Sequence, residues 1–256
     1  MSRLFLAPFF LAVVLALACD SGTPGPGQLR IAHLIPDAPA IDVCLKPDSA
    51  AAFGTPLIGG AGLSYPSLSA RTAFDAGTYS VRIVQGGATS CAGSLNGLGD
   101  VSAVLAADLP QTLVLTGRLT GSGSPSLNVK VFQDRIAASP GGSVSLRALN
   151  AAPGSNPQDV GVLASQLFQP FATNVGYGSV SEYQSISITP GSTNVTASLA
   201  SGDTGSQALW AAGTFNNVSD TGVYTLYVIG VPGQTGTPRP SLLLCSDSSV
   251  NCAQSP

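Results

Sequence analysis

The sequence predicts an all-β protein made of two tandem Ig-like antiparallel β-sandwich domains, and three observations support this prediction. The chain has 30 Gly and 19 Pro among 256 residues, so turn-forming residues recur throughout it. Between them stand short runs in which apolar and polar residues alternate, which is typical of half-buried strands. The same order of runs occurs twice, and each copy of about 110 residues has the length of an ordinary domain.

The alternation is clearest in residues 78–84, where Tyr79, Val81 and Ile83 point one way and the intervening side chains point the other way. Two sheets whose apolar faces meet in this manner pack about 10 Å apart, and the bulky side chains fill the space between them. The only helix that we consider is a short turn around residues 163–171. The body of the chain is therefore expected to consist of strands joined by turns.

The repeat is visible in matched residues. Arg147 follows Arg30 at an offset of 117 positions, and later matching segments keep their order at offsets of 112 to 117. A stretch rich in Pro, Gly and Ser separates the two copies. We therefore place the two domains at 29–136 and 143–252.

The N-terminus has the layout of a secretory signal peptide. A short positively charged start precedes an apolar run over residues 4–17, and small residues then lead to Cys19. A spanning helix needs about 20 apolar residues, so the run is too short to serve as a permanent membrane anchor. We predict a signal peptide at 1–18.

The segment LALACD (15–20) resembles the lipobox of bacterial lipoproteins, in which the Cys carries the lipid. We therefore predict lipidation of Cys19 and a flexible tether at 19–28, so that acyl chains hold the protein to a membrane. Ordinary signal cleavage stays an alternative, because Ala16 and Ala18 also satisfy the small-x-small pattern before the cleavage point.

The other cysteines are Cys44, Cys91, Cys245 and Cys252. An even number of cysteines in an exported chain predicts disulfides, and three pairings are possible. Sequence proximity and the repeat favour Cys44–Cys91 and Cys245–Cys252. No C-x-x-C motif is present, which argues against redox catalysis and against zinc.

Composition argues against several classes of function. The net charge is −3, and the 10 Lys and Arg residues form no cluster, so nucleic acid is not an expected partner. The single His, His33, stands on the apolar side of its strand, and the matching position in the second copy is Asn150. A structural polar anchor accounts for both residues, whereas a catalytic base accounts for only one. No catalytic residue, metal or cofactor is predicted.

The aromatic residues offer an alternative reading. Trp210 and the tyrosines could form a surface on which sugars stack, with Trp210 as the ligand contact. Core positions are favoured, because Tyr227 alternates with Thr225 and Ile229 as a core strand would. A module that binds carbohydrate or another polymer is therefore the second prediction. A hydrolase that uses His33 is the third.

Three aspartates, Asp37, Asp42 and Asp48, lie close together in the sequence. Their spacing does not fit a calcium loop, which needs alternating oxygen ligands and a late Glu. Roles in turns are favoured, and a weak calcium site at the loop ends stays open.

The first copy resembles a known family. The segments RIAHLIPDAPAIDVCL (30–45), FGTPLIGGAGLSYPSLSA (53–70) and AGTYSVRIV (76–84) are similar to the bacterial family called domain of unknown function 4397. In the second copy, NAAPGSNPQDV (150–160) is a degenerate match. The resemblance implies an exported, often lipid-anchored β-sandwich protein, and it implies no activity.

We therefore predict a non-catalytic lipoprotein of the bacterial cell envelope, anchored at the periplasmic face or the cell surface. Its expected role is that of an interaction or scaffolding module, because loops on a rigid β scaffold commonly carry function. The expected partners are the membrane, through the N-terminal lipid, and a protein or glycan that the sequence does not identify.

Overall fold

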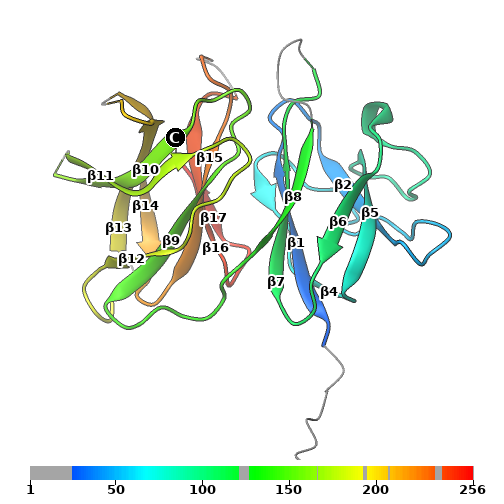
Figure 1. Cartoon of the computed structure of the whole chain (residues 1–256), viewed down its shortest axis with the longest axis horizontal. Coiled ribbons are helices and arrows are strands. Elements are labelled where there is room, and N and C mark those ends of the chain that lie inside the picture. Colours follow the sequence, from blue (N-terminus) through cyan, green and yellow to red (C-terminus); the bar gives the residue numbers. More distant parts are fainter. Residues whose placement is uncertain are drawn as a thin grey trace, which may run out of the picture.

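The computed structural model describes residues 25–120, 127–165, 167–192, 195–206, 208–233 and 238–255, and the regular structure in these residues is β-strand apart from one 3-10 turn at Leu95–Gly97. The signal peptide at 1–18, Cys19 and most of the tether at 19–28 lie outside the described residues. Figure 1 shows the strands in two halves that stand side by side, with the start of β1 at one end of the first half.

The first half contains two sheets, which we call A and B. In sheet A the strand order is β3-β1-β7-β8, and β4 pairs with the same strand, β1, as β3 does. In sheet B the order is β2-β5-β6. The strands are β1 (Gly27–Leu34), β2 (Ile41–Pro47), β3 (Ser67–Leu68), β4 (Thr72–Phe74), β5 (Gly77–Gln85), β6 (Val101–Leu105), β7 (Pro110–Thr116) and β8 (Asn128–Gln133).

The second half contains sheets C and D in a matching arrangement. Sheet C has the order β12-β9-β15-β16-β17, and sheet D has the order β11-β10-β13-β14. The strands are β9 (Ser143–Asn150), β10 (Gln158–Ala164), β11 (Leu167–Val175), β12 (Gln184–Ser187), β13 (Val195–Asp203), β14 (Leu209–Val218), β15 (Val223–Ile229), β16 (Ser241–Ser246) and β17 (Cys252–Gln254). Among the described residues of the first half, no strand occupies a position equivalent to that of the edge strand β11 or of the edge strand β17.

Two strand pairs correct the prediction of antiparallel sheets. Strands β1 and β7 pair in parallel, and so do β9 and β15. Alternation of apolar and polar residues determines the face to which a side chain points, but it carries no information about the direction of the neighbouring strand. Strands of sheet B lie between β1 and β7 along the chain, and such a long crossover permits parallel pairing.

The four sheets stack in the order B, A, C, D. One apolar cluster fills the space between sheets A and B, a second fills the space between C and D, and a third lies between A and C. The strands β1 and β9 are consequently buried on both faces. Leu29 and Ile31 of β1 face sheet B, whereas Ala32 and Leu34 face the other half. This arrangement places every second residue of β1 and β9 at the junction of the halves.

The short helical turn considered for residues 163–171 is not present. This segment forms the end of β10 and the start of β11, which pair in an antiparallel hairpin with irregular register. Leu167 is 64% exposed at the sheet edge. The spacing of apolar residues in so short a segment does not distinguish a helical turn from an edge strand.

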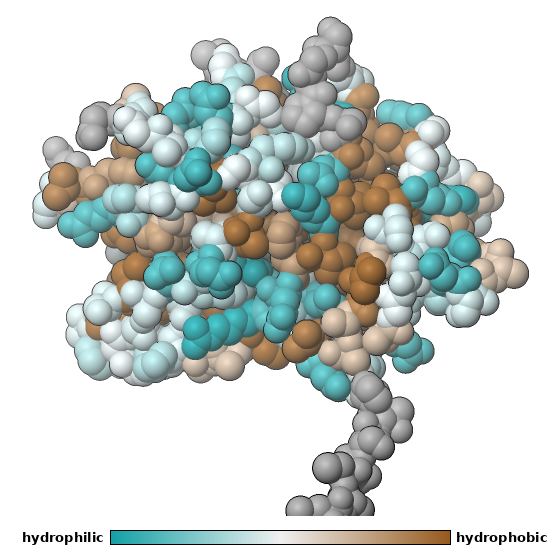
Figure 2. Space-filling model, viewed as in Figure 1, coloured by the Kyte–Doolittle hydropathy of each residue, from teal (hydrophilic) through white to brown (hydrophobic). Residues whose placement is uncertain are grey.

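The surface is mixed in polarity. On the face shown in Figure 2, apolar residues gather over β6 and β8, where the edges of sheets A and B meet. Val104 of β6 is 68% exposed there. In the described part of the chain, no helix has the length and apolar character needed to cross a membrane.

Candidate functional site

The most unusual feature of the molecule is a cluster of charged side chains buried between the two halves. Arg30 of β1 and Arg147 of β9 point from sheets A and C into the junction, where they are 1% and 3% exposed. Asp134 follows β8, and Asp247 follows β16; both side chains are fully buried. Buried charges are tolerated when they are paired and hydrogen-bonded, and these four side chains meet both conditions. We call them the charge cluster.

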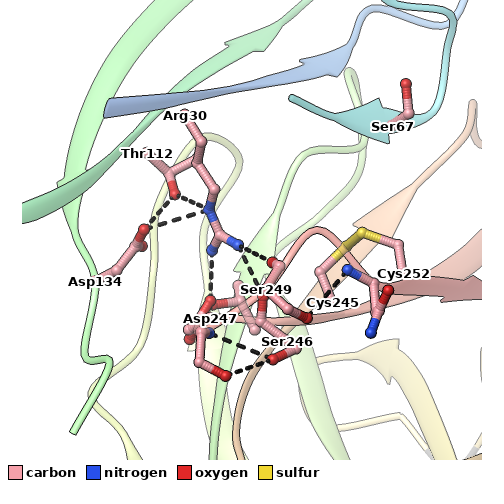
Figure 3. The surroundings of a disulfide bond; sticks show 12 residues. Arg30, Ser67, Thr112, Asp134, Cys245, Ser246, Asp247, Ser249 and Cys252 are labelled. Carbon is pink, nitrogen blue, oxygen red and sulfur yellow. Dashed lines mark hydrogen bonds and ion pairs between the residues drawn. A yellow bond between two sulfur atoms is a disulfide. The ribbon is translucent and has the colours of Figure 1, made fainter. Parts of the chain in front are cut away.

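Each arginine pairs with the aspartate of the other half. Nη2 of Arg30 donates to Oδ1 of Asp247 at 2.5 Å, and Nη2 of Arg147 donates to Oδ1 of Asp134. Nε of Arg30 also lies 3.4 Å from Oδ2 of Asp134. Figure 3 shows Arg30 between the two aspartates. Because the ion pairs cross the junction, they join the first half to the second.

Neutral groups complete the cluster in the same way on both sides. Nε of Arg30 donates to the hydroxyl of Thr112 at 2.8 Å, and Nε of Arg147 donates to the hydroxyl of Thr225 at the same distance. Each threonine then donates to the aspartate of its own half, at 2.6 Å for Asp134 and 2.9 Å for Asp247. Together with the Nη1 contacts to backbone carbonyls, these bonds give every donor nitrogen of the two guanidinium groups an acceptor.

Backbone carbonyls at the ends of β8 and β16 also take part. Nη1 of Arg147 donates to the carbonyl of Gln133 at 2.7 Å, and Nη1 of Arg30 donates to that of Ser246 at 2.8 Å. The arrangement is thus an approximate two-fold one.

The two aspartates differ in their remaining neighbours. Asp134 accepts a further hydrogen bond from Nη2 of Arg71 at 2.6 Å, whereas Asp247 accepts one from the Tyr183 hydroxyl at 2.8 Å. The Tyr183 ring also lies 4.6 Å from the guanidinium of Arg147. Burial raises the pKa of Asp247, and the nearby arginines oppose this effect only in part. Among the described residues, the Asp247 carboxylate has an uncharged tyrosine where the Asp134 carboxylate has a further arginine.

A cleft of about 610 Å³ opens beside the charge cluster. Its wall includes Arg135, Glu182 and Tyr183, and Ile136 is 44% exposed there. The buried members of the cluster that reach this wall, Asp134 and Arg147, already have partners on their polar atoms. The cluster consequently acts as a clamp between the halves.

His33 and Asn150 occupy equivalent buried positions. Nε2 of His33 lies 3.1 Å from the carbonyl of Pro39, and the amide of Ile35 donates to its Nδ1 at 3.4 Å. The side chain of Asn150 likewise accepts from the amide of Ala152 at 3.2 Å and donates to a backbone carbonyl. Burial lowers the pKa of His33 to about 4. Both side chains hold a turn after the strand that carries them.

A family model for the domain of unknown function DUF4397 matches residues 27–161, just over half of the chain. The chain belongs to the DUF4397 family. The match begins at β1, covers the whole first half and continues through β9 into β10 of the second.

Comparisons with curated proteins and with solved structures add little to what the family match says about this DUF4397 protein. No curated protein matches the chain. Among solved structures, one similar chain comes from a structure described as alpha-glucan binding by a streptococcal virulence factor. The identity is 13%, the similarity covers 78% of this chain and 93% of that chain, and the TM-score is 0.25. A likeness at this level supports no statement about a ligand.

The cysteines of the DUF4397 protein form the two pairs that sequence proximity and the repeat favoured. Cys44 bonds to Cys91, and Cys245 bonds to Cys252. The first bond ties the outer face of sheet B to a loop and is buried in a small apolar cluster. The second joins β16 to the edge strand β17.

The aromatic residues are not gathered on one face. Trp210 is half-buried against the apolar cluster between sheets C and D, in which Tyr224 is buried. Tyr227 is buried between sheets A and C, Tyr183 contacts the charge cluster, and the Tyr177 hydroxyl donates to Thr116. These five side chains thus do not form the row that was considered for sugar stacking.

The three aspartates near the N-terminus are also separated. The carboxylate of Asp42 is buried and accepts hydrogen bonds from three backbone amides, while Asp37 accepts hydrogen bonds from Leu119 and Thr120. Asp48 is exposed. Among the described residues, no three His, Cys, Asp or Glu side chains gather into a group that could hold a metal ion.

Sequence reasoning did not find the charge cluster. One signal was available: Arg30 and Arg147 are equivalent in the repeat, and the residues that follow on the same side of their strands are apolar. A strand with two apolar faces is buried on both sides, so a charged residue in it needs a partner from another layer.

Proposed function

We propose that the protein is a non-catalytic, lipid-anchored component of the bacterial cell envelope that serves as an interaction or scaffolding module. The observation that carries the proposal is the charge cluster, which joins four sheets into one body. A body of this kind presents its loops in a fixed relative position, which suits the binding of a partner. The buried and hydrogen-bonded state of His33 supports a role without catalysis.

The location outside the cytoplasm has its own support. The two disulfides are typical of an oxidising compartment. Strand β1 begins at one end of the first half, and this position supports attachment through the segment that precedes it. The proposed order is therefore a lipid on Cys19, a short tether, and then the four-layer body.

The proposal also treats the halves as two copies of one Ig-like unit. The orders β1-β7-β8 and β2-β5-β6 match β9-β15-β16 and β10-β13-β14, which supports this, as do the matched contacts of Arg30 with Thr112 and of Arg147 with Thr225. Duplication of a unit whose two copies pack through the same face gives crossed pairs of the kind seen here.

Mass spectrometry of the processed protein tests the anchor. We expect a mature N-terminus at Cys19 that carries acyl chains, and processing of the precursor that globomycin blocks. The Cys19→Ala variant is the control and should lose both the lipid and the membrane association. An unmodified thiol on Cys19 in the mature wild-type protein would refute the anchor.

Photocrosslinking in whole cells tests the interaction role. A crosslinker at the exposed loop positions Ala51 and Thr55 should give adducts, whereas one at Ser102, on the outer face of sheet B, should give none. Adducts from Ser102 alone, or from no position, would contradict a role carried by the loops.

A further inference from the structure

The disulfide Cys245–Cys252 closes the loop that delivers Asp247 to the charge cluster. The two cysteines face each other on β16 and β17, and the six residues between them form the loop. Three oxygen atoms of this loop accept hydrogen bonds from Arg30, namely the carbonyls of Ser246 and Ser249 and the carboxylate of Asp247. Figure 3 shows the disulfide to one side of these acceptors.

This disulfide is more accessible than the other. Cys252 is exposed on the edge strand, whereas Cys44, Cys91 and Cys245 are 0%, 6% and 0% exposed. A hollow of about 660 Å³ lies next to Cys252 and is lined by polar residues such as Asn251 and by apolar residues such as Leu244 and Val250. Exchange begins when a thiolate reaches a disulfide sulfur, so access favours reaction at this bond.

The first half has no equivalent bond. Phe132 stands 113 positions before Cys245, at the matching place on β8, and the chain after Asp134 runs on into the second half. Both aspartates have their backbone amide fixed to the preceding paired strand, Asp134 to Pro110 and Asp247 to Val223, each at 2.8 Å. The disulfide is thus an additional restraint on the Asp247 side alone.

The Asp247 side also has fewer cations. The carboxylate of Asp134 lies within 4.0 Å of three arginines, Arg30, Arg71 and Arg147, whereas the carboxylate of Asp247 lies that close to Arg30 alone among the described residues. Arg71 contacts Asp247 only at its backbone carbonyl, at 2.9 Å. The position that Arg71 occupies in the first half is taken by Tyr183 in the second. Loss of the restraint is consequently expected to disturb Asp247 first.

We propose that Cys245–Cys252 is a site of thiol–disulfide exchange with a dithiol reductant, and that opening it loosens the hold of the Asp247 loop on Arg30. One thiolate of the reductant attacks Sγ of Cys252, a mixed disulfide forms, and Sγ of Cys245 leaves and takes a proton from water. The second thiol of the reductant then displaces Sγ of Cys252. The protein gains two electrons and two protons, and the reductant becomes a disulfide.

Opening the bond is expected to act on the loop and to leave the sheets paired. The hydrogen bond from the Asp247 amide to Val223 remains, as do those of the Thr225 hydroxyl to the carboxylate. Ser255 also keeps its backbone hydrogen bond to Leu242. The change is therefore a local release at residues 246–252, and it does not depend on where in the cell the protein resides.

The test treats the folded full-length protein with dithiothreitol in increasing amounts and traps free thiols with an alkylating agent. Peptide mapping should show Cys245 and Cys252 labelled before Cys44 and Cys91. Hydrogen–deuterium exchange of the partly reduced protein should then show protection in residues 246–252 lower by at least about tenfold, because the loop regains the freedom that the crosslink removed.

A matched pair of variants completes the experiment. The Cys245→Ser, Cys252→Ser protein should show the same faster exchange in residues 246–252 without any reductant, and the Cys44→Ser, Cys91→Ser protein should not. Equal or earlier labelling of Cys44 and Cys91 would overturn the proposed site. Unchanged protection of the loop after selective reduction would overturn the proposed consequence.

Discussion

The replacement Asp134→Asn tests the charge cluster most sharply, because it removes one charge and keeps the shape of the side chain. Asp134 accepts hydrogen bonds from Arg71 and Thr112 at 2.6 Å each and pairs with Arg147. Among the described residues, Arg147 has no second ion pair, and it is 3% exposed. Leaving one buried charge without its partner costs about 3–5 kcal/mol. This is a large share of the roughly 5–15 kcal/mol that stabilises a typical domain.

Urea unfolding measures this loss. With a slope of about 3 kcal/mol/M, at the upper end for proteins of modest size, the midpoint should fall by about 1–2 M. Fluorescence of the single Trp210 reports on the second half, and circular dichroism reports on both halves. Because the cluster belongs to both halves, the two signals should shift together.

The control for this experiment is Asp100→Asn. Asp100 pairs with Arg82 through two contacts of 2.8 Å, yet the side chains are 33% and 23% exposed. A pair so open to water contributes about 1 kcal/mol or less. A loss in Asp134→Asn that is no larger than the loss in Asp100→Asn would refute the reasoning about the cluster.

Three further predictions follow from buried groups. The pKa of His33 falls from 6.5 to about 4 on folding, so its contribution of about 3 kcal/mol to the free energy of unfolding is complete above pH 6.5 and is lost as the pH falls to about 4. In His33→Asn, the urea midpoint should therefore depend less on pH across this range. An unchanged dependence of the midpoint on pH would contradict the assignment. The Tyr227 hydroxyl is fully buried and makes no hydrogen bond to the described residues, so Tyr227→Phe should leave the thermal midpoint unchanged or raise it, and a loss above about 1 kcal/mol would show a missed partner. The bond Cys44–Cys91 closes a loop with a sequence separation of 47, so replacing both residues by Ala should cost about 4 kcal/mol in urea unfolding, and a loss under about 1 kcal/mol would be inconsistent with this.

The strands with one solvent-facing side were predictable from sequence. In β5, Tyr79, Val81 and Ile83 are buried, and the residues between them are half-buried, as the alternation predicted. The reason is physical: a sheet with one core face separates apolar from polar side chains with a period of two. The all-β class is confirmed on the same kind of evidence, and both disulfide pairs, which were favoured by sequence proximity and the repeat, are confirmed as well.

The junction between the halves was not predictable in the same way. Arg30 and Asp247 are 217 positions apart, and no local pattern connects them. Alternation assigns Arg30 to the face of β1 opposite Leu29 and Ile31, but it does not say what covers that face. Only the packing of sheet A on sheet C brings the two residues together. The parallel pairing of β1 with β7 was missed for a related reason, since strand direction depends on tertiary contacts.

The placement of His33 shows how a repeat can guide such reasoning. A lone His invites a catalytic interpretation, yet the second copy has Asn150 at the same position. Both residues accept a backbone amide hydrogen bond from two positions later, Ile35 in one half and Ala152 in the other. Comparison of the copies therefore pointed to an interaction that either side chain can make.

The central claim is that crossed ion pairs join the two halves into one cooperative body, and differential scanning calorimetry of the disulfide-bonded protein tests it most directly. We predict a single transition in which the calorimetric enthalpy equals the van't Hoff enthalpy. Two resolved transitions in the wild-type protein, one for each half, would contradict the claim.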